Sequence, residues 1–294
     1  MTARLRLDPS VYLVTDTQQC GGPAGVVATV DAAVTGGVTA VQLRDPGATT
    51  RELVDLGRAL VALLRPRGVP LVVDDRVDVA LAVGADGAHV GQSDLDPVSA
   101  RRLLGPERHL GLSVSTPEEA RATADLPPGT VDLLGVGPVR PTLSKTDARP
   151  AIGFARLAIV AAATELPCVA IGGLRAADVP ALHDAGAAGS AVVSAVCGRL
   201  DPAGAAREIA HAWDIVRAGD RSDVRANDRP DAHTDDRRDA HTGDRPGAHA
   251  DDRPGAHADD RADADADGQP GAHADGRPSG RSSGRSRTTT GRAS

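Results

Sequence analysis

Paired acidic residues follow two neighbouring apolar runs in the first half of the chain. Asp74 and Asp75 come directly after the run at 71–73, and Asp94 comes shortly after the run at 88–90. Neighbouring parallel strands lie about 4.8 Å apart, so carboxylates at the same ends of two such strands can hold one divalent cation. Asp is also a common N-terminal cap of helices. For these aspartates alone, both interpretations remain open: capping of a helix and binding of a metal ion.

Residues that bind anions follow other apolar runs. Gly172 and Gly173 can bring backbone N–H groups close to a phosphate, and Ser194 adds a hydroxyl group. Arg44 and Lys145 add positive charge near further runs. Carboxylates together with phosphates favour Mg²⁺, which often joins one or two carboxylates to substrate phosphates. The sequence therefore predicts a site for phosphorylated substrates and Mg²⁺, with a surface network of ion pairs as the alternative.

These residues stand at the ends of short apolar runs that recur eight times. The runs are mostly continuous rather than alternating, which is typical of parallel strands buried on both faces. Helix starts lie between them: Thr49 and Glu52 form a capping-box pattern, and Pro follows Asp96, Thr116 and Asp201. The predicted strands are 11–14, 40–43, 71–73, 88–90, 110–114, 131–136, 168–171 and 191–193.

Alternation of eight strands with helices predicts an α/β fold, a (β/α)8 TIM barrel, over residues 1–218. A doubly wound open sheet is the alternative, because counting strands does not show that the sheet closes. In a (β/α)8 barrel the active site lies at the C-terminal ends of the strands. There Gln42 and Arg44 would follow the second strand and Ser113 the fifth, on the rim that also carries the acidic pair and the glycines.

The composition changes sharply near residue 218. From 219 to 294 there is no Leu, Ile, Met, Phe, Trp, Tyr or Cys, and an eight-residue pattern such as DRPGAHAD recurs. Such a segment cannot bury enough apolar surface to offset its ordering entropy. We therefore predict two parts: a barrel at 1–218 and a disordered low-complexity tail at 219–294.

Charge, cysteine content and hydropathy exclude several classes of protein. A net charge of -7 argues against a nucleic-acid partner. The three cysteines are odd in number and widely spaced, which argues against a disulfide framework or a zinc site and favours the reducing cytoplasm. No apolar stretch is long enough to span a membrane. The sequence leaves the oligomeric state open.

Six motifs stand in order within residues 11–212: QLR from Gln42, VDDRVDVALAVGADGAHVGQSDL from Val73, GLS from Gly111, GVGPVRPTLSKTD from Gly135, AIGGL from Ala170 and VVSAV from Val192. Together they resemble the thiamine phosphate synthase family. The resemblance implies a (β/α)8 barrel and a transferase that acts on two small phosphorylated substrates. It would condense 4-amino-2-methyl-5-(diphosphooxymethyl)pyrimidine with a (carboxy)thiazole phosphate, release diphosphate by a dissociative Mg²⁺-assisted mechanism, and yield thiamine phosphate.

The resemblance assigns roles to residues on the pyrimidine side. The diphosphate substrate would contact Gln42, Arg44, Asp74, Ser113 and Lys145. Of these, the catalytic residues would be Arg44, Ser113 and Lys145, which would stabilise negative charge on the departing diphosphate.

The resemblance also implies a metal site and a second substrate site. Asp75 and Asp94 would bind Mg²⁺. The thiazole phosphate would be bound by Thr142, Leu143, Ser144, Gly173, Val193 and Ser194.

Two positions depart from the family pattern. Pro46 stands where the family usually has Lys, and Asp74 stands where it usually has Asn. An extra carboxylate should repel a diphosphate unless a cation or a hydrogen-bond donor compensates. Two alternatives remain at this stage: a thiazole tautomerase-like isomerase of the same fold, and a non-catalytic phosphate-binding protein.

Overall fold

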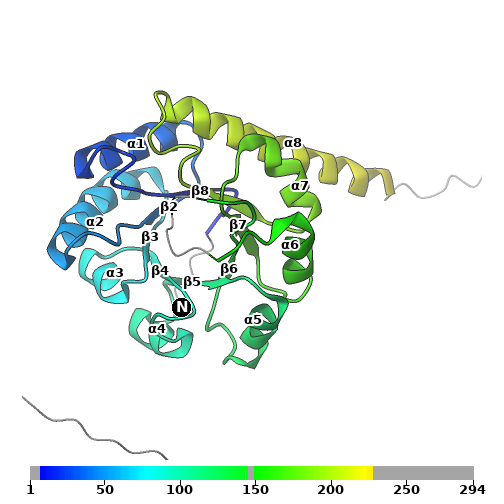
Figure 1. Ribbon diagram of the computed structural model, residues 1–294, viewed down its shortest axis with the longest axis horizontal. Coiled ribbons are helices and arrows are strands. Elements are labelled where there is room, and N and C mark those ends of the chain that lie inside the picture. Colours follow the sequence, from blue (N-terminus) through cyan, green and yellow to red (C-terminus); the bar gives the residue numbers. More distant parts are fainter. Residues whose placement is uncertain (1–6, 143, 145–148, 228–294) are drawn as a thin grey trace, which may run out of the picture. The chain divides into compact units, whose positions relative to one another are not determined.

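The computed structural model describes residues 7–142, 144 and 149–227. Its eight parallel strands form a closed barrel in which each strand pairs with its neighbours in sequence, and β1 pairs with β8 (Figure 1). The closed sheet confirms the predicted barrel and excludes the open sheet. The strands are β1 (Val11–Val14), β2 (Ala40–Leu43), β3 (Leu71–Asp74), β4 (Gly87–Val90), β5 (His109–Val114), β6 (Leu133–Val136), β7 (Cys168–Ile171) and β8 (Gly189–Val192).

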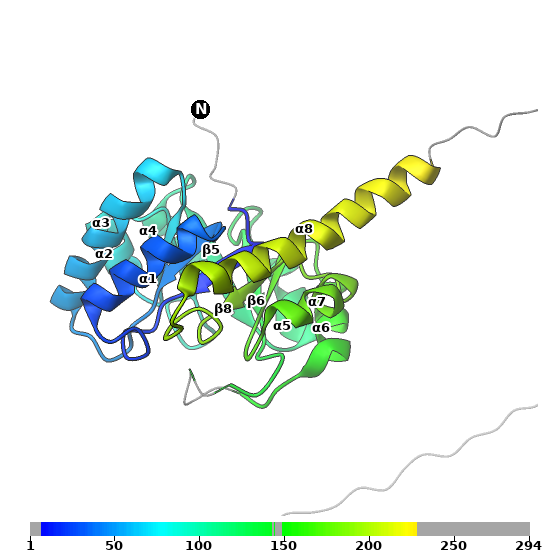
Figure 2. The ribbon, with the colours of Figure 1, turned by 90° about the horizontal axis from the view of Figure 1, so that it is seen from above.

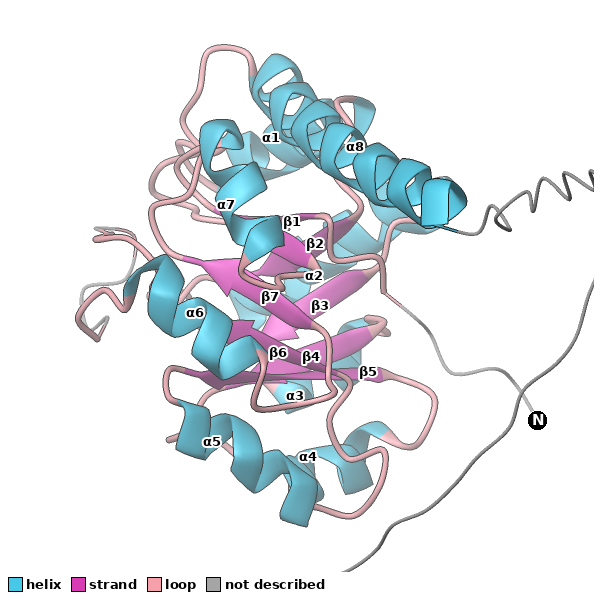
Figure 3. Ribbon diagram, turned by 90° about the vertical axis from the view of Figure 1, so that its right-hand side faces the viewer, coloured by secondary structure: helices cyan, strands magenta, loops and turns pink. Residues whose placement is uncertain are grey.

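Helices surround the barrel and begin where the capping residues predict (Figure 3). The Thr49 hydroxyl accepts a hydrogen bond from the N–H of Glu52, whose carboxylate accepts one from the N–H of Thr49. The α-helices are α1 (Pro23–Thr35), α2 (Thr50–Leu64), α3 (Val77–Val83), α4 (Pro97–Leu104), α5 (Pro117–Arg121), α6 (Gly153–Ala161), α7 (Val179–Asp184) and α8 (Pro202–Asn227). Short 3-10 turns follow α2 at Arg65–Arg67 and α5 at Ala122–Asp125, and one precedes α7 at Ala176–Asp178.

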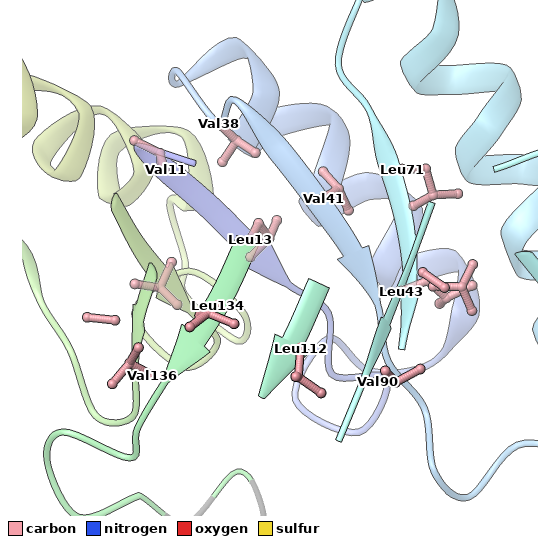
Figure 4. Close-up of a cluster of buried hydrophobic side chains, with 14 of the residues drawn as sticks. Val11, Leu13, Val38, Val41, Leu43, Leu71, Val90, Leu112, Leu134 and Val136 are labelled. Atoms are coloured by element: carbon pink, nitrogen blue, oxygen red, sulfur yellow. The ribbon is translucent and has the colours of Figure 1, made fainter. Parts of the chain in front are cut away.

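The side chains that point outward from the strands form the main core. Leu13, Leu43 and Leu134 are fully buried in this layer between the strands and the helices (Figure 4). Burying one such side chain stabilises the fold by about 1.5–3 kcal/mol. The helices are therefore held mainly by aliphatic packing from every second position of each strand.

The intervening positions point into the barrel and form a second, smaller cluster, which includes Tyr12, Val72 and Leu133. Towards the C-terminal ends of the strands the interior becomes polar. Gln42 lies within β2 and Ser113 within β5, each near the C-terminal end of its strand and inside the predicted ranges 40–43 and 110–114. Their backbones take part in strand pairing, so the barrel itself fixes their positions.

Strand boundaries differ from the predicted ones by a residue or two, as is usual. The largest differences are at β6, which begins at Leu133 rather than at 131, and at β8, which spans Gly189–Val192 rather than 191–193. Helix α8 continues past residue 218 and ends at Asn227, and Asp220 lies 2.9 Å from the Nε2 atom of His183 on α7. Residues 228–294 of the predicted tail lie outside the described residues. Among the helices described, none is long and apolar enough to cross a bilayer.

Trp213 fixes α8 to the barrel. Its indole is buried, and its Nε1–H donates a hydrogen bond of 2.9 Å to the hydroxyl of Ser190 on β8. The ring also makes an edge contact with His183 and lies beneath the guanidinium of Arg217. Helix α8 thereby packs against both α1 and α7 (Figure 2).

We expect a chain that ends at Asn227 to melt within about one degree of the full-length protein, because the removed segment has no large apolar side chain to bury. A chain that ends at Ala218 also loses the end of α8 and the contact between His183 and Asp220. Its Tm should fall by about 2–4 °C, for a loss of about 1 kcal/mol. Thermal melts followed by circular dichroism test this, with Asp220→Asn as the control for the ion pair alone. Equal Tm values for the two shortened chains would contradict it.

Candidate active site

A cavity of about 330 Å³ lies inside the barrel towards the C-terminal ends of the strands. The polar inward residues and the loops beyond the strands line it together. Asp75 is not among the lining residues, and Leu143 and Lys145 lie outside the described residues. The residues predicted from the sequence that do line it are Gln42, Arg44, Asp74, Asp94, Ser113, Thr142, Ser144, Gly173, Val193 and Ser194.

Ser113 is held from two sides. Its Oγ atom lies 3.0 Å from the Nε2 atom of His89 on β4, and its carbonyl oxygen accepts a hydrogen bond of 2.8 Å from the side chain of Gln92. His89 is itself buried. These contacts fix the Ser113 hydroxyl on the wall of the cavity.

A glycine on β5 and another on β6 make room for the His89 ring. A Cβ atom added to Gly111 would lie 2.2 Å from the Nδ1 atom of His89, and one added to Gly135 would lie 3.0 Å from its Cε1 atom. Real Cβ atoms essentially never come as close as 2.2 Å, and a contact of 3.0 Å is tighter than most. The histidine on β4 therefore requires glycine at position 111, and glycine at position 135 spares it a tight contact.

Tyr12 and Gln42 form the floor of the same cavity. The Gln42 amide donates a hydrogen bond of 3.4 Å to the Tyr12 hydroxyl, and both side chains are buried. Burial raises the pKa of Tyr12 far above its ordinary value, the hydrogen bond from Gln42 opposes this, and the charge of Asp74 adds to it. Tyr12 therefore stays neutral.

Arg44 connects the two sides of the cavity. Its Nε atom lies 3.4 Å from the Oδ2 atom of Asp74 on β3, and its Nη1 atom donates a hydrogen bond of 3.2 Å to the carbonyl oxygen of Ser144. The side chains of Arg44 and Asp74 are only 17% and 16% exposed, so solvent screens this pair less than a surface pair. The carboxylate that departs from the family pattern is therefore compensated by the neighbouring guanidinium.

The glycine pair after β7 has no room for side chains. Gly172 and Gly173 have φ values of 107° and 62°, in the region that favours glycine. A Cβ atom on Gly173 would also lie 2.5 Å from the carbonyl oxygen of Pro141. The backbone here therefore approaches the loop after β6 closely.

A wider hollow of about 1280 Å³ borders the cavity and shares Arg44, Thr142, Ser144, Gly173 and Ser194 with it. The loop after β1 forms part of its wall. There the Gln19 amide donates hydrogen bonds to Asp16, at 2.9 Å, and to the Ser144 hydroxyl, at 3.3 Å. The cavity in the barrel and the hollow at the rim thus meet at residues predicted to bind phosphate.

Asp75 and Asp94 are compatible with a magnesium site that the substrate completes. Asp75 has a φ of 58°, which is uncommon for a residue other than glycine and frequent at functional sites. Its N–H donates a hydrogen bond of 2.7 Å to the carbonyl oxygen of His89. Asp94 lines the cavity and accepts a hydrogen bond of 2.7 Å from the N–H of Gly91. Within the described ranges, no group of three or more His, Cys, Asp or Glu side chains could hold a metal alone.

Comparisons with known proteins identify the family. The model of the thiamine monophosphate synthase family matches residues 11–196. The chain belongs to the thiamine monophosphate synthase family. A thiamine-phosphate synthase of Azorhizobium caulinodans is 52% identical over 202 residues, which cover 69% of this chain and 93% of that protein. One of Xanthobacter autotrophicus is 54% identical over 202 residues, covering 69% and 94%.

A solved structure agrees with the thiamine monophosphate synthase family. The thiamine phosphate pyrophosphorylase of Pyrococcus furiosus superposes with a TM-score of 0.65 at 36% identity, over 72% of this chain and 99% of that one. The family resemblance in the motifs is thereby confirmed. The chain is an enzyme of this family, a transferase of thiamine biosynthesis that acts on small substrates.

Several residues that contact the cavity had no role predicted from the sequence. Tyr12, His89 and Gln92 line the cavity, and Gln19 contacts Ser144. Alternate side chains of a strand point to the same face. Tyr12 and His89 occupy inward-pointing positions of β1 and β4, as Gln42 and Ser113 do in β2 and β5, so this alternation would have found them. No comparable periodicity applies to Gln19 and Gln92, which lie in loops.

We expect Gly111→Ala to destabilise the fold by about 1–3 kcal/mol, as overpacking usually does, and to lower turnover by displacing His89 from Ser113. In a His89→Ala background the same change should cost less than about 0.5 kcal/mol, because the clash has been removed. Urea denaturation of the four proteins in this cycle measures the coupling. Gly47→Ala is the matched control, since its Cβ would meet nothing nearer than Asp45 at 3.7 Å. Equal costs in the two backgrounds would contradict the proposed contact.

Proposed function

We propose that the enzyme joins 4-amino-2-methyl-5-(diphosphooxymethyl)pyrimidine to a (carboxy)thiazole phosphate, giving thiamine phosphate and diphosphate. The observation that carries the proposal is the position of Arg44. Its side chain contacts Asp74 on the side proposed for the pyrimidine diphosphate and Ser144 on the side proposed for the thiazole phosphate. One cation thus stands between two groups of residues suited to phosphorylated ligands.

The pyrimidine diphosphate would lie in the barrel cavity. Gln42 would hydrogen-bond to the pyrimidine ring, and Asp74 would accept a hydrogen bond from its amino group. Arg44, Ser113 and Lys145 would contact the diphosphate. In a dissociative reaction the bond from the methylene carbon to oxygen breaks first and its electron pair leaves with the diphosphate. The thiazole nitrogen then donates its lone pair to the carbocation that the pyrimidine stabilises.

The contact between His89 and Ser113 has a consequence for this reaction. A serine hydroxyl has one hydrogen to donate. For Ser113 to donate it to a diphosphate oxygen, His89 must carry its own proton on Nε2 and donate to the serine oxygen. His89 would then act as a positioning residue that aims the hydroxyl at the departing diphosphate and takes no part in proton transfer to the substrate.

The thiazole phosphate would lie at the rim, among the loops after β6, β7 and β8. Gly173 would offer its backbone N–H, while Thr142 and Ser144 would offer hydroxyl groups. Leu143, Val193 and Ser194 would complete the site. The hydrogen bond from Gln19 to Ser144 supports this location, because it holds one of these hydroxyl groups at the edge of the cavity.

Asp75 and Asp94 would hold Mg²⁺, with water and diphosphate oxygens as the remaining ligands. Bound there, Mg²⁺ would stabilise the negative charge that develops on the diphosphate. Arg44 and Lys145 would supply the other positive charges. We place the enzyme in the cytoplasm, because its three cysteines are all free thiols.

The test is to incubate the purified enzyme with both substrates over a range of Mg²⁺ concentrations and to measure thiamine phosphate. We expect metal-dependent product from the native chain. Asp75→Asn should need about tenfold more Mg²⁺ for half-maximal turnover, a loss of about 1.4 kcal/mol in metal binding. An unchanged titration would remove Asp75 from the metal site. A folded enzyme that gives no product with either metal or substrate in excess would refute the proposed reaction.

Asp74→Asn, which restores the family pattern, should lower the KM for the pyrimidine diphosphate by about threefold to tenfold. The change removes a negative charge and frees Arg44 to interact fully with the diphosphate. Asp74→Ala is the control that removes the charge without supplying an amide. Steady-state kinetics at saturating thiazole phosphate measure both variants. A higher KM in Asp74→Asn would mean that the carboxylate, and not its neutralisation, serves substrate binding.

A further inference from the structure

Two of the three cysteines lie side by side, although they come from opposite ends of the barrel sequence. Cys20 lies in the loop after β1, and Cys197 lies in the turn after β8. Because β1 and β8 pair to close the barrel, this loop and this turn are neighbours. The two cysteine side chains are hydrogen-bonded to each other, and the Sγ atom of Cys197 lies 3.7 Å from the carbonyl oxygen of Val14.

The backbones around the two thiols are also in contact. A Cβ atom added to Gly198 would lie 3.1 Å from the carbonyl oxygen of Gln19. A backbone hydrogen bond fixes each cysteine within its own turn. The N–H of Cys20 donates to the carbonyl oxygen of Asp16 at 3.0 Å, and the N–H of Cys197 donates to the carbonyl oxygen of Val193 at 2.8 Å. A disulfide needs α-carbons within about 7 Å of each other, so its formation here depends on this closeness of the two turns.

The two thiols differ in chemical character. Cys20 is half-buried, whereas Cys197 is buried. The hydrogen bond from Cys197 lowers the pKa of Cys20 to about 6 against the opposing effect of burial, and Thr29, Asp16 and Gly198 lower it further through hydrogen bonds. The neighbouring Cys20 sulfur, followed by burial, raises the pKa of Cys197. Cys20 thus has the thiolate character of a nucleophile, and Cys197 keeps its proton nearby.

We propose that Cys20 and Cys197 form a reversible dithiol–disulfide pair that is oxidised by hydroperoxides and that alters phosphate binding at the rim of the active site. The Cys20 thiolate attacks one peroxide oxygen, the O–O bond breaks, and the other oxygen leaves as an alcohol or water after taking up a proton. Cys20 becomes a sulfenic acid. The sulfur of Cys197 then attacks the sulfur of Cys20, an S–S bond forms, and the S–O bond breaks with release of water.

The pair can affect the site because each cysteine belongs to a segment that contacts it. Next to Cys20, Gln19 donates a hydrogen bond to the Ser144 hydroxyl. In the turn of Cys197, Arg199 donates a hydrogen bond of 3.0 Å to the carbonyl oxygen of Ser194. A covalent bond between these segments would shift both contacts. This part of the inference rests on the proposed location of the phosphate group.

The third cysteine supplies an internal control. Cys168 is buried in β7, where burial raises the pKa of its thiol to about 11. Its Sγ atom lies 3.6 Å from the carbonyl oxygen of Leu166. It should therefore resist a dilute peroxide that oxidises Cys20.

The first experiment maps the oxidised thiols in the full-length chain. After reduction and a stoichiometric pulse of hydrogen peroxide, we expect a peptide cross-linked between Cys20 and Cys197, both in the native chain and in Cys168→Ser. Dithiothreitol should reverse the cross-link. In Cys197→Ser, Cys20 should instead be trapped by dimedone as a sulfenic acid. Three remaining free thiols, or a cross-link that involves Cys168, would overturn the proposal.

The second experiment measures binding without using turnover. Isothermal titration calorimetry with inorganic phosphate should show an affinity about tenfold weaker in the oxidised chain, with full recovery after reduction. Cys197→Ser should bind phosphate equally well before and after the pulse. Equal affinity in the oxidised and reduced native chain would refute the effect on the site. Because neither experiment depends on the transferase reaction, failure to form thiamine phosphate would count only against the proposed function.

Discussion

The hydrogen bonding between β1 and β8 is the constraint on which the other features depend. Once the sheet closes, each strand must direct one set of side chains outward to the helices and the other into a shared interior. The outward set is almost wholly aliphatic and holds the helices. The inward side chains do not pack against the helices. Near the C-terminal ends of the strands these positions can therefore be polar, as Gln42, His89 and Ser113 are.

Within this interior, charge is distributed around one guanidinium. Arg44 lies just past the end of β2, between a carboxylate on β3 and a carbonyl oxygen in the loop after β6. Asp74 thus does not stand as an isolated negative charge beside a site for anions. The chain tolerates its departure from the family pattern because the compensating cation was already part of the site. As a result, the charge of the Arg44 guanidinium is partly neutralised by Asp74 before any substrate binds.

Sequence patterns were sufficient for the architecture but not for the contacts between side chains. Continuous apolar runs and the capping pair of Thr49 and Glu52 located the strands and α2, because these signals are local. The pairing of Arg44 with Asp74 joins residues from two strands, and the slot for His89 depends on glycines in two others. Such contacts depend on strand register, which no local pattern specifies. The roles assigned to all the site residues stay predictions, and two of these residues, Leu143 and Lys145, lie outside the described ranges.

The contact of Trp213 with Ser190 has a practical consequence. Trp213 is the only tryptophan in the chain, and its indole nitrogen is bonded to β8, the strand that completes the barrel. Intrinsic fluorescence excited at the indole band therefore comes from a single place in the chain. Its emission wavelength reports directly on whether the last helix covers the last strand. The enzyme thus carries a built-in optical signal for barrel closure that needs no label.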